Sequence, residues 1–210
     1  MLHDFSQIAE FLWVCDDILS KEECSLLTKE ACPHLEDVAV LDYDEGVIKD
    51  RKSRDAKERL LVKSHYNPQQ KIYGTIEKIE KITSLITRLP IENQEHLNII
   101  NYRKDGHYVP HYDFFLEGAE NYEADMERGG QRAYSVLFYL NSSYDGGETG
   151  FPKLDNFKIE PRIGRVLFWS NFSENKPIEE SLHSSLPVEK GTKWIGVKWV
   201  RYSKYLSRKS

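Results

Sequence analysis

Apolar residues at helical spacing predict two amphipathic helices in the first part of the chain. In KIYGTIEKIEKITSLITRL (71–89), isoleucines recur every three or four residues, at positions 72, 76, 79, 82 and 86, which is the period of one helix face. Pro90 follows and favours an end to this helix. Before KEECSLLTKEA (21–31), Ser20 and Glu23 have the spacing of a capping box. Each helix therefore needs another surface on which to bury its apolar face.

The stretch between these helices is charged and poor in large apolar residues at its centre. It reads DYDEGVIKDRKSRDAKERLLVK and runs from Asp42 to Lys63. Such a composition is typical of a solvated loop, or of a mobile segment lying over a site. The pattern alone leaves both interpretations open.

From His96 onward the pattern changes to short strands rich in β-branched and aromatic residues. The candidates are HLNIINY, HYVPHYDFF, AYSVLFYL, GRVLFWSN, SLHSSLPV and KWIGVKWVRY, with turns such as YDGGE between them. Short strands with few helices between them indicate a β-barrel or a two-sheet roll. We expect a mainly β fold with flanking α-helices that cover one outer face. One domain is predicted over 1–210, with a mostly helical support region at 1–92 and a β core at 93–205.

Composition narrows the classes of function. The chain has 210 residues, of which 40% are apolar and 30% charged, a profile typical of a folded globular domain. Its net charge of −5 and pI near 5.8 argue against a nucleic-acid partner. No stretch approaches the roughly 18 apolar residues that a membrane helix needs, and the N-terminus has no basic segment followed by an apolar run. The sequence thus predicts no membrane partner and a cytoplasmic location.

Three cysteines lie near the N-terminus: Cys15, Cys24 and Cys32. An odd number without paired spacing does not indicate a disulfide framework. A zinc site would need a fourth ligand, and only His34 is near in sequence. We therefore expect buried or partly buried free thiols.

A possible metal site comes from two distant segments. In a strand, HYVPHYDFF would place His107, Val109, His111 and Asp113 on one face. His111 and Asp113 would then lie about 7 Å apart along the backbone, close enough to converge on one ion. A histidine and an aspartate spaced in this way are a weak signal alone, but His183 on a later strand would complete a set of two histidines and one carboxylate. That set leaves coordination positions open, as in non-haem iron(II) oxygenases.

Lys193 is the second candidate of this β region. It follows the turn Glu189-Lys190-Gly191, which is expected to bring it back beside His183 on a neighbouring antiparallel strand. Trp194, Ile195 and Val197 flank it, so burial is expected. A buried lysine needs an anionic partner, and a dicarboxylate bound to the metal at its other end would supply one.

At this point the sequence resembles the prolyl 4-hydroxylase branch of the iron(II)- and 2-oxoglutarate-dependent dioxygenases. The resemblance covers nearly the whole chain and rests on several segments in order: ILSKEEC, YRKDGHYVPHYDFF, GGQRAYSVLFYLN, DGGETGFP, IEPRIGRVLFWSN and SLHSSLPVEKGTKWIGVKWV. It implies a double-stranded β-helix (jelly roll) core supported by N-terminal helices. It also implies hydroxylation of prolyl residues in a peptide or protein, with release of succinate and CO2.

The resemblance also implies roles for individual residues. His111, Asp113 and His183 correspond to iron ligands, and Lys193 to the residue that binds 2-oxoglutarate. Further site residues are implied around the co-substrate and near the substrate: Tyr102, Tyr139 and Thr149 for the former, Trp199, Arg51 and Arg54 for the latter. Iron(II), 2-oxoglutarate and O2 would be required, with ascorbate as reductant and a proline-containing peptide or protein as partner. A monomer or a homodimer is expected.

Three alternatives are compatible with the same residues. The iron chemistry could act on a free amino acid or on a side chain other than proline. A sensor could keep the iron and 2-oxoglutarate sites without catalysis, although an intact ligand set argues against this. An isomerase or zinc hydrolase on a similar roll usually has more histidines and no matching lysine.

Overall fold

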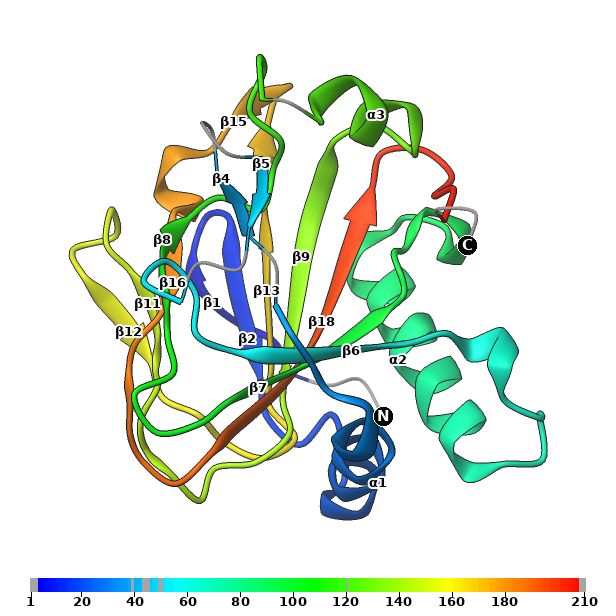
Figure 1. Ribbon diagram of the computed structural model, residues 1–210. Coiled ribbons are helices and arrows are strands. Elements are labelled where there is room, and N and C mark those ends of the chain that lie inside the picture. Colours follow the sequence, from blue (N-terminus) through cyan, green and yellow to red (C-terminus); the bar gives the residue numbers. More distant parts are fainter. Residues whose placement is uncertain (1–3, 39, 43–45, 49–50, 120, 208–210) are drawn as a thin grey trace.

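Two β-sheets face each other in the computed structural model, with the two long helices on the outside of the larger one (Figure 1). The structure describes residues 4–38, 40–42, 46–48, 51–119 and 121–207. The larger sheet has eight strands, in spatial order β1 (Ser6–Ala9), β2 (Leu12–Cys15), β13 (Val166–Ser170), β9 (Arg132–Tyr139), β18 (Lys193–Arg201), β7 (Leu97–Tyr102), β6 (Lys57–Leu61) and β3 (Glu36–Asp37). The smaller sheet has four: β12 (Phe157–Ile159), β11 (Thr149–Phe151), β16 (His183–Ser185) and β8 (Tyr108–His111).

Short ladders and helices complete the fold. The two-stranded ladders pair β10 (Asp145–Gly146) with β17 (Val188–Lys190), β14 (Phe172–Ser173) with β15 (Lys176–Pro177), and β4 (Val40–Asp42) with β5 (Gly46–Ile48). The α-helices are α1 (Lys21–Ala31), α2 (Lys71–Thr87) and α3 (Tyr122–Glu127). The described residues also form the short 3-10 helices η1 (Cys32–His34), η2 (Lys63–His65), η3 (Ile91–Asn93) and η4 (Glu179–Ser181).

Alternation along the strands of the larger sheet separates two apolar cores. On β9, Val136 and Phe138 point to the helices, whereas Leu137 and Tyr139 point between the sheets. Neighbouring strands repeat this alternation, because successive side chains of a strand face opposite ways. One core therefore joins the larger sheet to α1 and α2, and the other fills the space between the two sheets. The predicted mainly β roll with helices on one outer face is confirmed.

The two predicted helices form where the pattern places them. Ser20 caps α1: its hydroxyl accepts from the Glu23 amide at 3.2 Å, and the Glu23 carboxylate accepts from the Ser20 amide at 2.8 Å. On α2, Ile72, Ile76 and Ile79 are buried against the larger sheet. The helix ends at Thr87, and Arg88 adopts a left-handed conformation before Pro90.

Residues 1–92, predicted as a mostly helical support region, contain strands as well as helices. This region also supplies β1, β2, β3 and β6 to the larger sheet. Within the stretch from Asp42 to Lys63, β6 pairs with β7, and Arg54 forms an isolated bridge with Tyr108. Residues 43–45 and 49–50 of that stretch lie outside the described residues. These strands have two to five residues, too few to give a clear alternation, so long-range pairing defines them.

The three cysteines differ in their exposure. Cys15 and Cys24 are buried free thiols as predicted, but Cys32 is exposed, because it begins η1 at the surface.

Within the described part of the chain, no helix has the length and apolar character needed to cross a membrane. The predicted single domain over 1–210 stays a prediction.

Replacing Ser20 by alanine should lower the free energy of unfolding by about 1 kcal/mol, because α1 loses the hydrogen bond from the Glu23 amide to the Ser20 hydroxyl. Urea denaturation followed by circular dichroism would measure the change. Ser25→Ala, inside the same helix, is the matched control and should be neutral or slightly stabilising. An equal loss in both variants would contradict the role given to the cap.

Candidate active site

Three potential metal ligands from separate segments converge between the sheets. His111 ends β8 and His183 begins β16, and the two residues lie directly opposite each other in the antiparallel pair. Their ring centroids are 4.2 Å apart. Asp113 completes the group, and the ligand atoms of the three residues all lie within 4.8 Å of one another. This is a compact set of two imidazoles and one carboxylate that fits a single metal ion.

Backbone carbonyl groups orient both imidazoles. Nδ1 of His111 lies 2.9 Å from the Val109 carbonyl oxygen, and Nδ1 of His183 lies 2.9 Å from the Ser181 carbonyl oxygen. A proton on each Nδ1 would leave Nε2 with a free lone pair, which is how histidine commonly presents itself to a metal. The Nε2 atoms of His111 and His183 lie 3.8 and 3.6 Å from the two carboxylate oxygens of Asp113. The free lone pairs and the carboxylate therefore face one another.

The protonation states at the site suit metal binding. Burial, together with the nearby His183, holds the pKa of His111 well below its ordinary value, so this imidazole is neutral at neutral pH. Burial alone would raise the pKa of Asp113, but His183, His111, Arg132 and a hydrogen bond from Ser135 outweigh it and lower the pKa to about 2. A neutral imidazole and an ionised carboxylate are the forms that bind metals.

A chain of side chains supports the Asp113 carboxylate from behind. The Ser135 hydroxyl donates to Oδ2 of Asp113 at 2.5 Å. The Asn171 side-chain amide donates in turn to the Ser135 oxygen at 3.2 Å and to the Arg132 carbonyl at 3.0 Å. Ser135 and Asn171 are fully buried. These contacts fix the orientation of the carboxylate.

The predicted placement of Asp113 on the same strand as His111 is wrong. Strand β8 ends at His111, and Asp113 lies in a bend beyond it. The chain leaves the sheet there because Gln131 holds it elsewhere: its side-chain oxygen accepts from the Phe115 amide at 2.8 Å and its nitrogen donates to the Phe115 carbonyl at 2.7 Å. Asp113 therefore reaches the two histidines from the side, and not along the strand.

A small inner cavity of about 40 Å³ extends from the three potential ligands to Lys193. Lys193 is fully buried, and its Nζ donates to the Ser185 hydroxyl at 2.7 Å. Among the described residues no carboxylate lies within 4.0 Å of this ammonium group. Burial lowers the pKa of Lys193 to about 7. An anionic ligand would restore its charge.

The turn before Lys193 predicted that this residue would lie beside His183 on an adjacent strand. That prediction is wrong. Strand β18 belongs to the larger sheet, where Lys193 pairs with Tyr102 of β7. Lys193 instead reaches across the roll to Ser185, two residues after His183 on β16. The two residues thus face the same cavity from opposite sheets.

The other residues implied around the co-substrate divide into two groups. Tyr102 and Thr149 line the inner cavity, and Nζ of Lys193 lies 5.1 Å from the centre of the Tyr102 ring. Tyr139 lies behind this lining, where its buried hydroxyl is 2.6 Å from the Thr149 hydroxyl. Tyr139 therefore contacts the cavity through Thr149.

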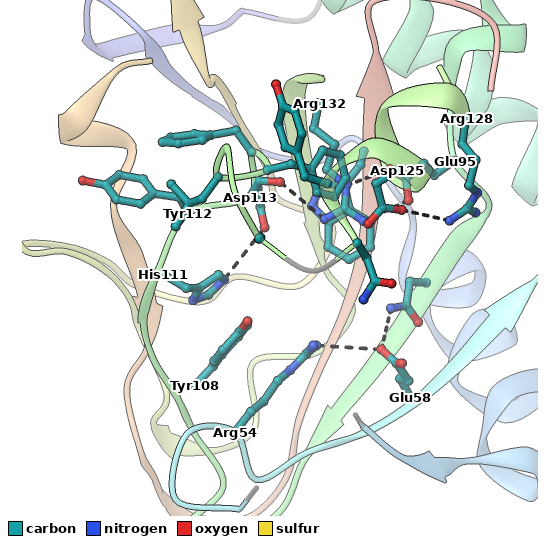
Figure 2. Close-up of a pocket in the computed structure, with 18 of the residues that line it drawn as sticks. Arg54, Glu58, Glu95, Tyr108, His111, Tyr112, Asp113, Asp125, Arg128 and Arg132 are labelled. Atoms are coloured by element: carbon teal, nitrogen blue, oxygen red, sulfur yellow. Dashed lines mark hydrogen bonds and ion pairs between the residues drawn. The ribbon is translucent and has the colours of Figure 1, made fainter. Parts of the chain in front are cut away.

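A larger groove of about 750 Å³ opens from the three potential ligands to the surface (Figure 2). Arg54 and Trp199 line both the groove and the inner cavity. Arg51 is outside the described lining of both, and its largely exposed guanidinium lies near Asp37 and Asp55. Of the predicted pair of arginines, the structure brings only Arg54 to the cavities.

Several residues of the site were missed in the sequence. Tyr108 stacks on the His111 ring with centroids 3.5 Å apart. Arg132 lies over the Trp199 ring at 3.8 Å, and its guanidinium donates to both carboxylate oxygens of Glu95 at 2.7 and 3.0 Å. Tyr108 is part of the quoted segment HYVPHYDFF, and its place beside a ligand was the available signal. Glu95 precedes the first core strand and carries no local signal.

Comparison with known proteins agrees with this geometry. The sequence model of the "2OG-Fe(II) oxygenase superfamily" matches residues 97–201. The chain is 32% identical to probable prolyl 4-hydroxylase 10 of Arabidopsis thaliana, over 91% of this chain and 69% of that protein. It is 33% identical to probable prolyl 4-hydroxylase 3 of the same plant, over 92% and 70%. The chain belongs to the 2OG-Fe(II) oxygenase superfamily.

Solved structures show that the fold of this oxygenase is that of prolyl hydroxylases. The viral collagen prolyl hydroxylase of Paramecium bursaria Chlorella virus-1, solved as a 2-oxoglutarate complex, has a TM-score of 0.68 at 24% identity and covers 93% of this chain and 98% of its own. A prolyl hydroxylase of Trichoplax adhaerens, in complex with a peptide fragment of hypoxia inducible factor, has a TM-score of 0.62 at 16% identity, over 92% and 84%. The predicted jelly-roll core is confirmed.

Removing the Ser135 hydroxyl should weaken iron(II) binding by this oxygenase about tenfold, because the Asp113 carboxylate loses its fixed orientation. Competition with a chromogenic chelator under anaerobic conditions would measure the affinity of Ser135→Ala. Ser173→Ala, on the exposed β14 strand, is the control and should bind iron as the parent does. Unchanged affinity in Ser135→Ala would contradict a supporting role.

The predicted ion pair between 2-oxoglutarate and Lys193 needs the charged form of the lysine, and the pKa of this group is about 7. The affinity for 2-oxoglutarate should therefore fall as pH rises above 7. At higher pH, binding must first return a proton to Lys193, which costs about tenfold in affinity per pH unit. Below pH 7 this dependence should disappear. Calorimetry on protein loaded with a redox-inert metal would measure it.

Two variants separate Lys193 from other titrating groups. Lys193→Arg stays charged throughout this range, so its affinity should no longer fall between pH 7 and 8.5. Lys193→Gln should bind weakly at every pH. A parent-like slope in Lys193→Arg would assign the pH dependence to another group.

Proposed function

We propose that this oxygenase hydroxylates prolyl residues of a peptide or protein, with consumption of O2 and 2-oxoglutarate and release of succinate and CO2. The observation that carries the proposal is the convergence of two imidazoles, one carboxylate and a buried lysine on one cavity that opens into a groove. The similarity to the Arabidopsis prolyl 4-hydroxylases supports the choice of substrate.

In this proposal His111, Asp113 and His183 hold iron(II). The bound iron supplies oxidative chemistry able to attack an unactivated C–H bond. The protein holds two imidazoles through backbone carbonyls and one carboxylate through Ser135. These contacts keep the three donor groups oriented before the metal arrives, which lowers the cost of assembling the site.

Lys193 binds the carboxylate of 2-oxoglutarate that lies farther from the metal. The ammonium group and the Ser185 hydroxyl are adjacent at 2.7 Å, and the Thr149 hydroxyl lines the same cavity. The Tyr102 ring lies beside Lys193. An ion pair formed there is shielded from water, so it orients the co-substrate along the cavity from Lys193 to the metal ligands.

The groove supports a peptide or protein as substrate, in preference to a small molecule. Its volume is about 750 Å³, and its lining includes Leu60 and Leu116 besides the potential metal ligands. Both leucines are more than 40% exposed, and aromatic side chains such as Tyr112 and Trp199 form much of the lining. Such a surface fits an extended chain with apolar and ring-shaped side chains.

Other expectations from the resemblance extend this proposal. We infer that ascorbate acts as reductant, to keep the iron ferrous between turnovers. The predicted cytoplasmic location and the monomeric or dimeric state stay predictions.

The deciding experiment is mass spectrometry of proline-containing peptides incubated with the protein, iron(II), ascorbate and 2-oxoglutarate. We expect the addition of one oxygen at proline, with one succinate formed per hydroxylation. Asp113→Ala should lose this activity at least a hundredfold, because an essential donor for the metal is removed.

The same assay separates the alternatives. Ser173→Ala, a surface change of similar size, should retain full activity. Oxygen added only to free amino acids or to other side chains would overturn the assignment to prolyl residues. Iron and 2-oxoglutarate binding without any oxygenated product would indicate a sensor.

A further inference from the structure

Arg54 brings a positive charge to the junction between the groove and the inner cavity. Its side chain is 9% exposed, and it lines both spaces. The guanidinium lies 4.6 Å from the centre of the Tyr108 ring, and Tyr108 stacks on His111 at 3.5 Å. Figure 2 shows the three side chains in this order. One aromatic ring therefore separates Arg54 from a potential metal ligand.

The backbone on either side of Arg54 is bound to strand β8. Arg54 itself bridges Tyr108, the Val109 amide donates to the Ser53 carbonyl at 2.9 Å, and the Asp55 amide donates to the His107 carbonyl at 2.9 Å. The segment therefore continues the smaller sheet beyond β8. This pairing holds the arginine at a constant position relative to His111.

The charge of Arg54 is poorly matched inside the protein. Nη2 lies 3.8 Å from the Glu58 carboxylate, too far for a hydrogen bond. Nε is buried and has no hydrogen-bond partner among the residues that the structure describes, and the guanidinium contacts the neutral Tyr102 hydroxyl. A buried cation in this state costs free energy that a better-placed anion would recover.

Two other arginines of the groove are fully engaged. Arg132 makes two hydrogen bonds to Glu95, and Arg128 donates to Asp125 at 3.1 Å and to the Tyr205 hydroxyl at 2.6 Å. Of the arginines in the described lining of the groove, Arg54 is thus the one with capacity for another anion.

We propose that Arg54 binds a carboxylate of the substrate on or next to the residue that is hydroxylated, and so selects substrates with an acidic group at that place. This inference rests on the proposed function and specifies its substrate class. Glu58 can release Arg54 when such a carboxylate enters, because Glu58 keeps its hydrogen bond from the Asn98 amide at 2.7 Å. The incoming carboxylate then forms the hydrogen bonds that Glu58 does not reach.

The carboxylate has two possible sources with the same chemistry. It is either the side chain of an aspartate or glutamate that flanks the target proline, or the α-carboxylate of a proline at the end of a peptide. Short peptides separate them: one pair carries glutamate or glutamine beside an internal proline, and a second pair ends in proline as the free acid or the amide.

The test compares kcat/KM for these peptides in the parent and in Arg54→Gln. We expect the parent to prefer the carboxylate member of one pair about tenfold, the effect of a charged hydrogen bond in a shielded site. Arg54→Gln should abolish the preference, and Arg54→Glu should reverse it for a lysine-flanked peptide. The KM for 2-oxoglutarate should stay within about twofold, because the diacid is anchored at Lys193.

Arg51→Gln is the matched control, because it removes the same charge from the same segment at a position outside the described cavity lining. It should keep the preference for the carboxylate peptide. Loss of the preference in both variants would overturn the proposal, since long-range charge and not contact would then be responsible. Equal rates for both members of each pair in the parent would overturn it too, as would an effect of Arg54→Gln confined to the KM for 2-oxoglutarate.

A binding measurement keeps this test independent of turnover. Fluorescence anisotropy would report the affinity of the same labelled peptides for protein loaded with a redox-inert metal and 2-oxoglutarate. A preference that depends on Arg54 supports the inference even if no proline is hydroxylated, an outcome that would instead refute the proposed function. Equal affinity of both members of each pair refutes the inference alone.

Discussion

The buried carboxylate of Asp113 is the group on which the arrangement of the site depends. It is ionised and shielded from water, a state that is costly unless partners compensate the charge. Two imidazoles face its oxygens, and the Ser135 hydroxyl donates to one of them. Each partner comes from a different part of the fold, since β8, β9 and β16 all contribute. Assembly of the roll therefore also assembles the metal-binding set.

Cations of the site differ in how well the protein compensates them, and this difference follows their proposed tasks. Arg132 is matched by Glu95 and packs on Trp199, so it has a structural role whether or not ligands are present. Lys193 has a hydroxyl partner and a lowered pKa, which suits a group that binds a diacid. The charge of Arg54 is only partly compensated, because its carboxylate partner Glu58 lies 3.8 Å away, too far for a hydrogen bond. An anion from outside the protein gains the most binding free energy beside a buried cation whose charge the protein compensates incompletely.

Local patterns in the sequence were enough for the two helices and the mainly β fold, and they named the candidate residues of the site. The capping box and the isoleucine spacing fall on α1 and α2, because both depend on residues within a few positions of each other. Strands β7, β8, β9, β13, β16 and β18 were also predicted, since their β-branched and aromatic residues are dense, whereas the shorter strands between them, β11 and β12 of the smaller sheet included, were not. The strands before α2 were missed, because strands of two to five residues depend on their partners in the sheet more than on their own pattern.

The sequence by itself determined which residue types are available: His111, Asp113 and His183 as potential ligands, and Lys193 as the buried cation. Only the tertiary structure decided how they meet. Asp113 lies beyond its strand and Lys193 approaches from the opposite sheet. Spacing along a strand reports which residues share a face, but the meeting of two sheets depends on contacts between residues far apart in the chain. The same contacts bury Arg54 and leave Arg51 exposed.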